Sequence, residues 1–241
     1  MTIRRFVSRL AIAGAAMTLS AGTAGADELR PFEAHYNVIW KGIGAGRSSI
    51  TLKRLDNGRW TYESRNIARG LFRIALPGDI SQTSEFRVVD DAVIPEHFRG
   101  DDGTSSTRKD VDIRFDWQAR HATGTAEDKK IEVALDPGVQ DGMSVQAALM
   151  LELMRGRTPS SFQMIDKDRV KEYLYTREGT ETLETALGRK ETVIFRSRRP
   201  DSEYSTMFWC APDLGYVPIK VERHHGAKIE WSMVVQSVTR E

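Results

Sequence analysis

The chain has 241 residues, with 35 lysines and arginines against 34 acidic residues and a formal net charge of +1. This balance gives no electrostatic basis for binding nucleic acid or an anionic membrane surface. A single cysteine, Cys210, excludes an intramolecular disulfide. Stability must therefore come from apolar burial and from the hydrogen bonds of a sheet.

The first 26 residues have the pattern of a secretory signal peptide. Arg4, Arg5 and Arg9 precede a short apolar stretch, and Ala24 to Ala26 provide a small-x-small cleavage site. An apolar stretch of about ten residues is too short to span a bilayer, which takes roughly 20. We therefore expect cleavage after Ala26 and a periplasmic protein of one domain, residues 27–241, that is not an integral membrane protein.

Most of the remaining chain alternates between apolar and polar residues in short runs. The first run places an apolar residue at every second position: Phe32, Ala34, Tyr36, Val38 and Trp40. This period of two is typical of half-buried strands. The turn that follows is expected at Gly42, Gly44 and Gly46.

Further strands are predicted at residues 48–52, 60–64, 80–88, 93–99, 111–117, 131–135, 162–165, 170–175, 191–196, 205–210, 217–223 and 229–238. The turns between them are short, which favours an antiparallel meander over βαβ units. Open sheets of more than about ten strands tend to curl.

One segment, residues 143–154, breaks the alternation and reads as an α-helix that is apolar nearly all round. Asp141 or Ser144 can cap the start of this helix, and Arg155, Gly156 and Arg157 suit its end. Such a helix should be buried on more than one side. We therefore predict a mainly β fold: a strongly curved antiparallel sheet or incomplete barrel wrapped around one apolar helix. A weaker candidate at residues 67–76 is either one helical turn or an apolar loop.

No constellation of catalytic or metal-binding residues stands out. The histidines are scattered, and the adjacent pair His224 and His225 would point to opposite faces of a strand. Cys210 has no CxxC partner and reads as a buried structural thiol. We therefore expect no cofactor, no metal and no enzymatic activity.

Large apolar side chains offer a different kind of site. The tryptophans lie in or beside predicted strands, where sheet packing is their ordinary role. A sharper hypothesis is that some of them line a groove for an apolar or glycan ligand, together with one face of the helix. The candidate lining residues are Trp40, Trp60, Trp117, Met143, Leu149 and Met150.

The most distinctive run is FWCAPDLGYVPIKVE, residues 208–222. It resembles the C-terminal signature of the DUF3108 family of exported bacterial proteins of unknown function. The opening YNVIWKGIGAG, residues 36–46, and the apolar helix after Asp141 are similar to that family as well. The resemblance covers nearly all of the mature chain and implies, by fold-level analogy, a curved sheet like that of periplasmic lipoprotein carriers.

Within this run the residues read as strand, turn and strand. Pro212 fixes φ at the start of the turn, Gly215 is placed where a positive φ is needed, and the side chain of Asp213 is expected to bond the turn backbone. We interpret the motif as structural, formed by Trp209, Pro212, Asp213, Gly215, Tyr216 and Pro218.

Three hypotheses of function remain open. The first is a non-catalytic periplasmic binding or carrier protein for an apolar or acyl ligand in the concave face of the sheet. The second is a structural or interaction protein of the cell envelope with a filled core, whose partner, an envelope protein, binds an exposed strand edge or the apolar segment of residues 71–76. The third is an enzyme acting on envelope glycan or lipid, for which no residue constellation is found.

Overall fold

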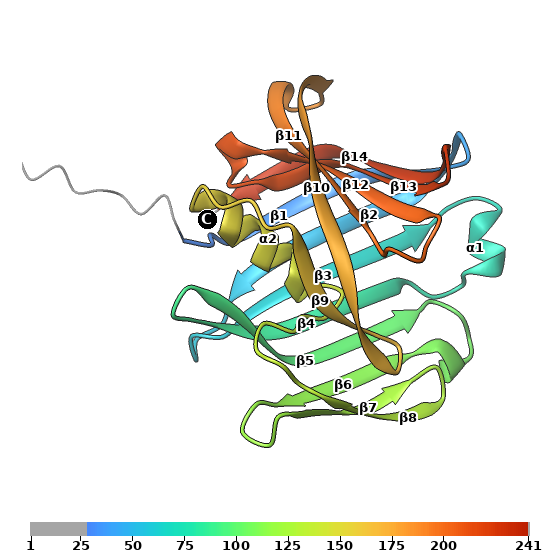
Figure 1. Cartoon of the computed structure of the whole chain (residues 1–241). Coiled ribbons are helices and arrows are strands. Elements are labelled where there is room, and N and C mark those ends of the chain that lie inside the picture. The colour runs from blue at the N-terminus through green and yellow to red at the C-terminus, as the bar shows by residue number, and fades with distance from the viewer. Residues whose placement is uncertain (1–27, 241) are drawn as a thin grey trace, which may run out of the picture.

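The computed structural model describes residues 28–240, which form one open antiparallel sheet of 14 strands (Figure 1). The predicted signal peptide lies outside the described residues. The strands are β1 (Phe32–Trp40), β2 (Ile43–Arg54), β3 (Trp60–Ala68), β4 (Ile80–Val89), β5 (Ala92–Asp102), β6 (Val111–Asp116), β7 (His121–Ala126), β8 (Lys129–Ala134), β9 (Ser161–Asp166), β10 (Arg169–Thr185), β11 (Gly188–Arg198), β12 (Tyr204–Ala211), β13 (Val217–His225) and β14 (Lys228–Arg240). The helices are α1 (Phe72–Ala75) and α2 (Ser144–Met154).

The strands follow chain order except at one place, where β1 pairs with β14 in the middle of the sheet. The edges are consequently β8 and β9, and the connection between them carries α2. Just before α2 the chain runs along the free edge of β9. There the backbone N–H of Gln140 donates to Gln163 O at 2.8 Å, and that of Ile165 donates to Gln140 O at 2.9 Å. This connection covers part of the β9 edge, which would otherwise expose unpaired backbone groups to pairing with another chain.

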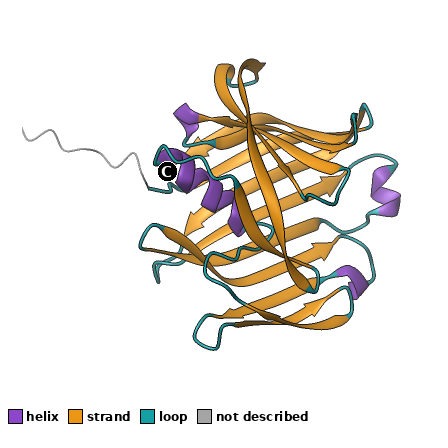
Figure 2. Cartoon of the chain, in the orientation of Figure 1, coloured by secondary structure: helices purple, strands orange, loops and turns teal. Residues whose placement is uncertain are grey.

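Helix α2 runs across the concave side of the curved sheet (Figures 1 and 2). Ala147, Met150 and Leu151 pack into one buried cluster, which includes inward residues of β1, β2, β3, β4 and β13. Leu149 and Leu153 pack in another cluster with side chains of β10 and β11. The prediction of a curved sheet around an apolar helix buried on more than one side is confirmed.

The start of α2 is fixed by a buried aspartate, as the sequence indicated. Asp141 Oδ1 accepts the backbone N–H groups of Met143 and Ser144, both at 2.8 Å. In return, Ser144 Oγ accepts the N–H of Asp141 at 2.9 Å. Ser84 of β4 donates its hydroxyl to Asp141 Oδ2 at 2.6 Å, which ties the helix to the sheet. These bonds satisfy backbone donors that a helix start leaves free.

Three local expectations need correction. Gly42 lies in the first turn with φ +82°, but Gly44 and Gly46 lie within β2. Gly46 is suited to that strand position because a Cβ there would collide with the carbonyl oxygen of Ile67 on β3. Strand β7 was not predicted, because its sequence HATGTA buries only small side chains. Strand β10 continues to Thr185, ten residues beyond its predicted end, because β11 pairs with it along the hairpin.

The C-terminal motif has the predicted strand, turn and strand geometry. Pro212–Leu214 forms a 3-10 turn, and Gly215 has a left-handed conformation with φ +64°. The side chain of Asp213 does not follow the prediction. Its Oδ2 accepts a hydrogen bond from Lys190 Nζ of β11 at 2.6 Å instead of one from the turn backbone.

Candidate ligand-binding cavity

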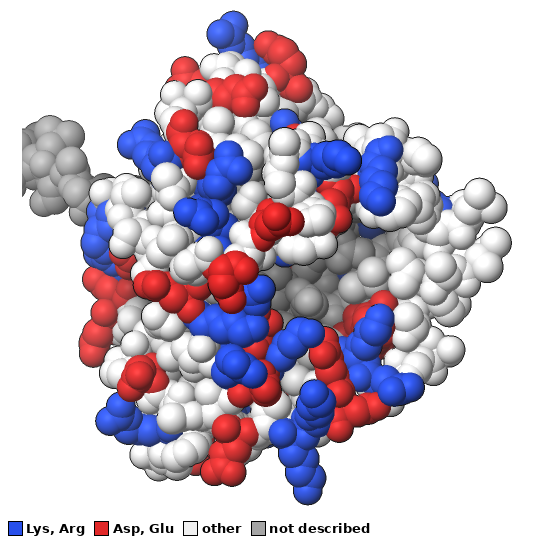
Figure 3. Space-filling view, turned by 45° about the vertical axis from the view of Figure 1, so that its right-hand side comes forward, with Lys and Arg blue, Asp and Glu red and all other residues white. Residues whose placement is uncertain are grey.

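A cavity of about 740 Å³ lies between the concave face of the sheet and the first turn of α2. This volume is within the range of small-molecule sites, about 300–1,000 Å³. Apolar side chains from distant strands form its walls, among them Val38, Ile50, Phe208, Val221 and Met233. They converge because the pairing of β1 with β14 brings the two ends of the chain together. Figure 3 shows a hollow on this side of the molecule.

The mouth of the cavity lies at the end of the sheet that carries α1. Trp40 at the end of β1 contacts Phe72 of α1 edge to face, with ring centroids 5.6 Å apart. Both residues line the cavity, and so does Leu76 just after α1. The helical candidate predicted at residues 67–76 is therefore a single turn, α1, that lies beside the mouth of the cavity.

The cavity also contains a few polar groups. Arg223 of β13 lines it and donates to Thr206 Oγ1 at 2.9 Å. Two further lining groups have no hydrogen-bond partner among residues 28–240: Nε2 of Gln146 and the hydroxyl of Tyr62. Both side chains are buried. Leaving a buried polar group unbonded costs about 1–3 kcal/mol, so these atoms favour a bound molecule with polar atoms of its own.

A charged cluster holds one wall of the cavity in place. Asp166 Oδ2 accepts hydrogen bonds from Lys171 Nζ, Tyr173 Oη and Arg199 Nη1 at 3.0, 3.0 and 2.8 Å. Burial favours a neutral carboxyl, but hydrogen bonds from Lys171 and Tyr173 prevail and lower the pKa of Asp166. Burial, with the negative charge of Asp166, raises the pKa of Tyr173 to about 12. Tyr173 is therefore a neutral hydrogen-bond donor in the cavity wall at neutral pH.

The structure brings two of the six predicted lining residues to the cavity, Trp40 and Met143. Trp60 also faces inward, but it lies in the packed cluster at the opposite end of β3. Leu149 and Met150 are buried on sides of α2 that pack against protein.

Trp117 lies under another part of the sheet, where its Nε1 donates to Pro95 O at 2.6 Å. It belongs to the cluster beneath β5 to β8 and not to the cavity. Sequence reasoning missed Gln146, Arg223 and the inward polar residues of β3. A usable signal was present, because the inward positions of β3 change from aromatic at 60 and 62 to polar at Ser64 and Asn66.

Cys210 is fully buried in β12, and burial raises the pKa of its thiol to about 12. The thiolate is the reactive form of cysteine, so this thiol is inert at neutral pH. The adjacent histidines bond different carboxylates. His224 Nε2 lies 2.9 Å from Glu222 Oε2, and His225 Nε2 lies 3.0 Å from Glu203 Oε2.

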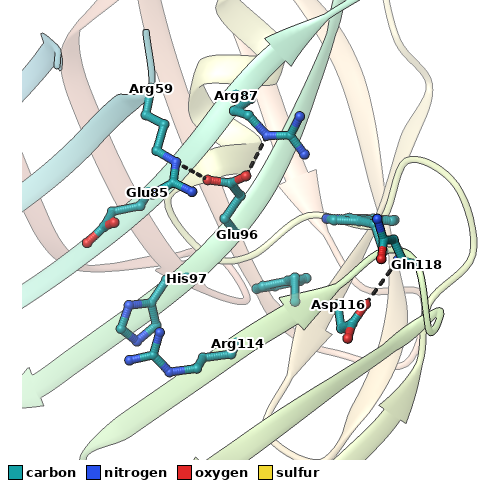
Figure 4. A pocket seen from close by; sticks show the side chains of 10 residues that line it. Arg59, Glu85, Arg87, Glu96, His97, Arg114, Asp116 and Gln118 are labelled. Atoms are coloured by element: carbon teal, nitrogen blue, oxygen red, sulfur yellow. Dashed lines mark hydrogen bonds and ion pairs between the residues drawn. The ribbon is translucent and has the colours of Figure 1, made fainter. Parts of the chain in front are cut away.

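A second hollow of about 390 Å³ is charged (Figure 4). Its residues come from β4, β5 and β6, from the turn after β6, and from the turn before β3, which contributes Arg59. Glu96 binds both Arg59 and Arg87, and His97 Nε2 lies 2.9 Å from Asp112 Oδ1. Glu96 is thus engaged by two arginines, and eight of the ten residues that line this hollow are polar or charged, the exceptions being Phe115 and Trp117.

Three carboxylates lie close together at the end of β5: Asp101, Asp102 and Asp110. Asp101 Oδ1 accepts the backbone N–H of Gly103 at 2.8 Å, and Asp102 Oδ1 accepts that of Thr104 at 3.1 Å. The bonds of Asp101 and Asp102 are those of aspartates that stabilise a turn, whereas Asp110 Oδ1 is buried without a hydrogen-bond partner among residues 28–240.

A family model for DUF3108, described as a protein of unknown function, matches residues 32–226. The chain belongs to the DUF3108 family. The match extends from β1 to the turn after β13 and therefore includes every strand except β14. No curated protein matches this DUF3108 chain.

Among solved structures, the chain is similar to a β-barrel-like protein of domain of unknown function DUF1849 from Brucella abortus. The TM-score is 0.61 at 13% identity, over 89% of this chain and 99% of that one. At this identity the likeness shows the fold alone. A looser likeness, with a TM-score of 0.38 at 10% identity, is to MucB in complex with MucA(peri), over 89% of this chain and 51% of that one. Within residues 28–240, no helix has the length and apolar character needed to cross a bilayer.

Proposed function

We propose that this DUF3108 protein is a non-catalytic periplasmic carrier that binds an apolar or acyl ligand in the concave face of its sheet. The observation that carries the proposal is the cavity of about 740 Å³, with apolar walls and with the Trp40–Phe72 contact at its mouth. Export to the periplasm is supported by the N-terminal leader, with its basic start and its small-residue cleavage site.

The polar groups of the cavity narrow the ligand class. A pure hydrocarbon would leave Gln146 Nε2 and the Tyr62 hydroxyl without partners, at a cost in free energy. An acyl chain with a carbonyl, ester or carboxylate group would supply an acceptor. Arg223 adds a positive charge among the lining residues. The ligand that fits these groups is an amphiphile whose apolar chain lies along the strand walls.

The cavity favours the carrier over the structural alternative, in which the concavity is filled by side chains. It also favours binding over catalysis. The groups that line it include tyrosines, serines and amides, while Asp166, which holds Tyr173, is engaged by Lys171 and Arg199. This arrangement presents no free carboxylate pair to a ligand.

Native mass spectrometry of protein purified from the periplasm tests the proposal directly. We expect a co-purifying amphiphile that is released when the protein is denatured. Ser64→Phe should block its binding, because Ser64 of β3 lines the cavity. Thr61→Phe is the matched control, since residue 61 has the opposite side-chain orientation on the same strand. Ligand-free parent protein that also fails to bind a fluorescent fatty acid would contradict the carrier function.

A further inference from the structure

Five exposed apolar side chains, among them the three most exposed large hydrophobic residues of the described part of the chain, gather beside the cavity mouth. Leu71, Ile74 and Ile43 are 83%, 80% and 61% exposed, and Trp40 and Ile67 are each 41% exposed. We call these five residues the apolar lip. Figure 3 shows an uncharged lobe next to the hollow, in keeping with these exposures.

Backbone pairing and ring contacts hold the lip together. Trp40 pairs with Ile43 across the β1–β2 hairpin. The backbone N–H of Arg69 donates to Ala45 O at 2.8 Å, which places the start of the α1 segment next to β2. The contact between Trp40 and Phe72 then fixes α1, and Leu71 precedes Phe72 in the chain. Since Phe72 faces the cavity, the lip is continuous with the cavity wall.

Cationic side chains surround the lip. Lys41, Arg47 and Arg69 are exposed, and they make no ion pair with any of residues 28–240. The Nζ of Lys41 lies 4.7 Å from the centre of the Trp40 ring. We call these three residues the basic rim. Asp79, which follows α1, is bound by both Arg65 and Arg73. Glu230 of β14 lies next to Lys41, whose backbone N–H donates to Glu230 O at 2.9 Å.

We propose that the apolar lip and its basic rim dock the protein on an anionic phospholipid membrane, with the cavity mouth facing the lipid. Exposed aliphatic residues, an amphipathic tryptophan and flanking cations form the combination that binds a bilayer interface. The near-zero net charge of the chain offers no long-range attraction to such a surface. The basic rim provides a local attraction instead, because basic residues act within about one Debye length of the anionic headgroups.

The proposal rests on the proposed function for its purpose: a carrier that docks mouth-first could exchange an amphiphile with a membrane without exposing the acyl chain to water. Its physical basis is independent of any ligand. A protein partner would have to cover several separate aliphatic side chains and also satisfy three cations. A phospholipid surface meets both demands with acyl chains and phosphates.

Co-sedimentation with vesicles tests the docking surface, using the chain from residue 27 onward. We expect the protein to bind vesicles of phosphatidylethanolamine and phosphatidylglycerol. Binding should be weaker at high salt, and weaker to vesicles of phosphatidylcholine alone. The double variant Leu71→Ser/Ile74→Ser should lose at least about tenfold in partitioning, since it removes two aliphatic side chains from the interface. Arg69→Ser should lose about fivefold on anionic vesicles only.

The matched control is Leu55→Ser/Val89→Ser, which changes two exposed apolar residues at the opposite end of the strands. Its partitioning should stay within about twofold of the parent, because these residues lie away from the lip. Parent protein that does not bind anionic vesicles would overturn the proposal, as would equal losses in lip and control variants.

Binding of a fluorescent fatty acid without vesicles separates this proposal from the carrier function. The lip variants should bind the probe as the parent does. Vesicle binding through the lip by a protein that never binds the probe would retain the docking surface and reject the carrier. A protein that binds the probe but not the vesicles would retain the carrier function and reject the docking surface.

Discussion

The ring of Trp40 meets that of Phe72 at the mouth of the cavity, with centroids 5.6 Å apart and planes inclined by 83°. The pair joins the end of β1 to α1, and both rings line the cavity. An edge-to-face pair of this kind contributes about 0.5–1.5 kcal/mol beyond its buried area. We predict that this pair slows the passage of a ligand through the mouth.

Phe72→Ala should speed release of a bound fluorescent fatty acid by roughly threefold or more, as expected when an aromatic pair is lost. Thermal stability should change little, because Phe72 is only partly buried. Stopped-flow displacement of the probe measures the rate. Leu71→Ala is the control, since Leu71 is exposed and does not line the cavity. An unchanged rate in Phe72→Ala would show that this pair does not gate the mouth.

Gln146→Met should weaken binding of ligands that carry a carbonyl group, while leaving the ligand-free protein as stable or more stable. Gln146 is 6% exposed, and its Nε2 has no partner among the described residues. Methionine keeps the length of the side chain and removes the unsatisfied donor. Loss of one hydrogen bond, about 1 kcal/mol, corresponds to about fivefold in affinity. Competition by a fatty-acid methyl ester and by an alkane of equal length separates the two effects: only the ester should lose affinity.

Sequence pattern predicted the fold well because the periods of strand and helix follow directly from which face is buried. The alternation at Phe32 to Trp40 gives β1 with its observed bounds, and the lack of alternation around Met150 gives α2. The same reasoning missed β7, where Ala122 and Ala126 are buried but too small to mark a face. Local pattern also gave no register for the pairing of β1 with β14, which joins the two ends of the chain.

The candidate site was predicted less well, for a related reason. A helix that is apolar all round does not reveal which side faces a cavity, so Leu149 could not be distinguished from Met143 by composition. Trp60 and Trp40 both lie on inward faces of their strands. Trp60 lies where the concave face is filled by packed side chains, and Trp40 lies where the cavity is open. That difference follows from the tertiary arrangement of α2 and not from any local pattern.

Asp141→Asn should preserve the start of α2, whereas Asp141→Ala should destabilise the protein by about 1–2 kcal/mol. Asparagine retains an oxygen for the N–H groups of Met143 and Ser144, and its amide can donate to Ser84 Oγ in place of the present bond. Alanine retains neither group. Chemical denaturation of both variants beside the parent measures the difference, and equal losses would contradict this role.

The difference in stability between the parent and Asp141→Asn should change with pH in a defined direction. Burial raises the pKa of Asp141 above the usual 3.8, although its hydrogen bonds oppose the shift. The folded state therefore holds its proton more tightly than the unfolded state. As pH rises from 3.8 through the raised pKa, the parent should lose stability relative to Asp141→Asn, and the difference should become constant at higher pH. A parent that gains stability relative to Asp141→Asn over this window would show that the hydrogen bonds outweigh burial.

Gly215→Val should cost about 1–2 kcal/mol or more, because Gly215 has φ +64° and a Cβ in the left-handed region is strained. The added Cβ would also lie 2.8 Å from Arg240 Nη2, a flexible side chain that can move. Gly215→Asn separates the two effects: it meets the same arginine, but asparagine tolerates this conformation better, so it should cost less.

Asp213→Ala should lose no more than about 1 kcal/mol, since it removes a half-exposed ion pair with Lys190. Thermal unfolding of the three variants beside the parent measures each loss. If Gly215→Val were as stable as the parent, the turn would not depend on a left-handed residue; if Asp213→Ala removed ligand binding at unchanged stability, the motif would belong to a binding site.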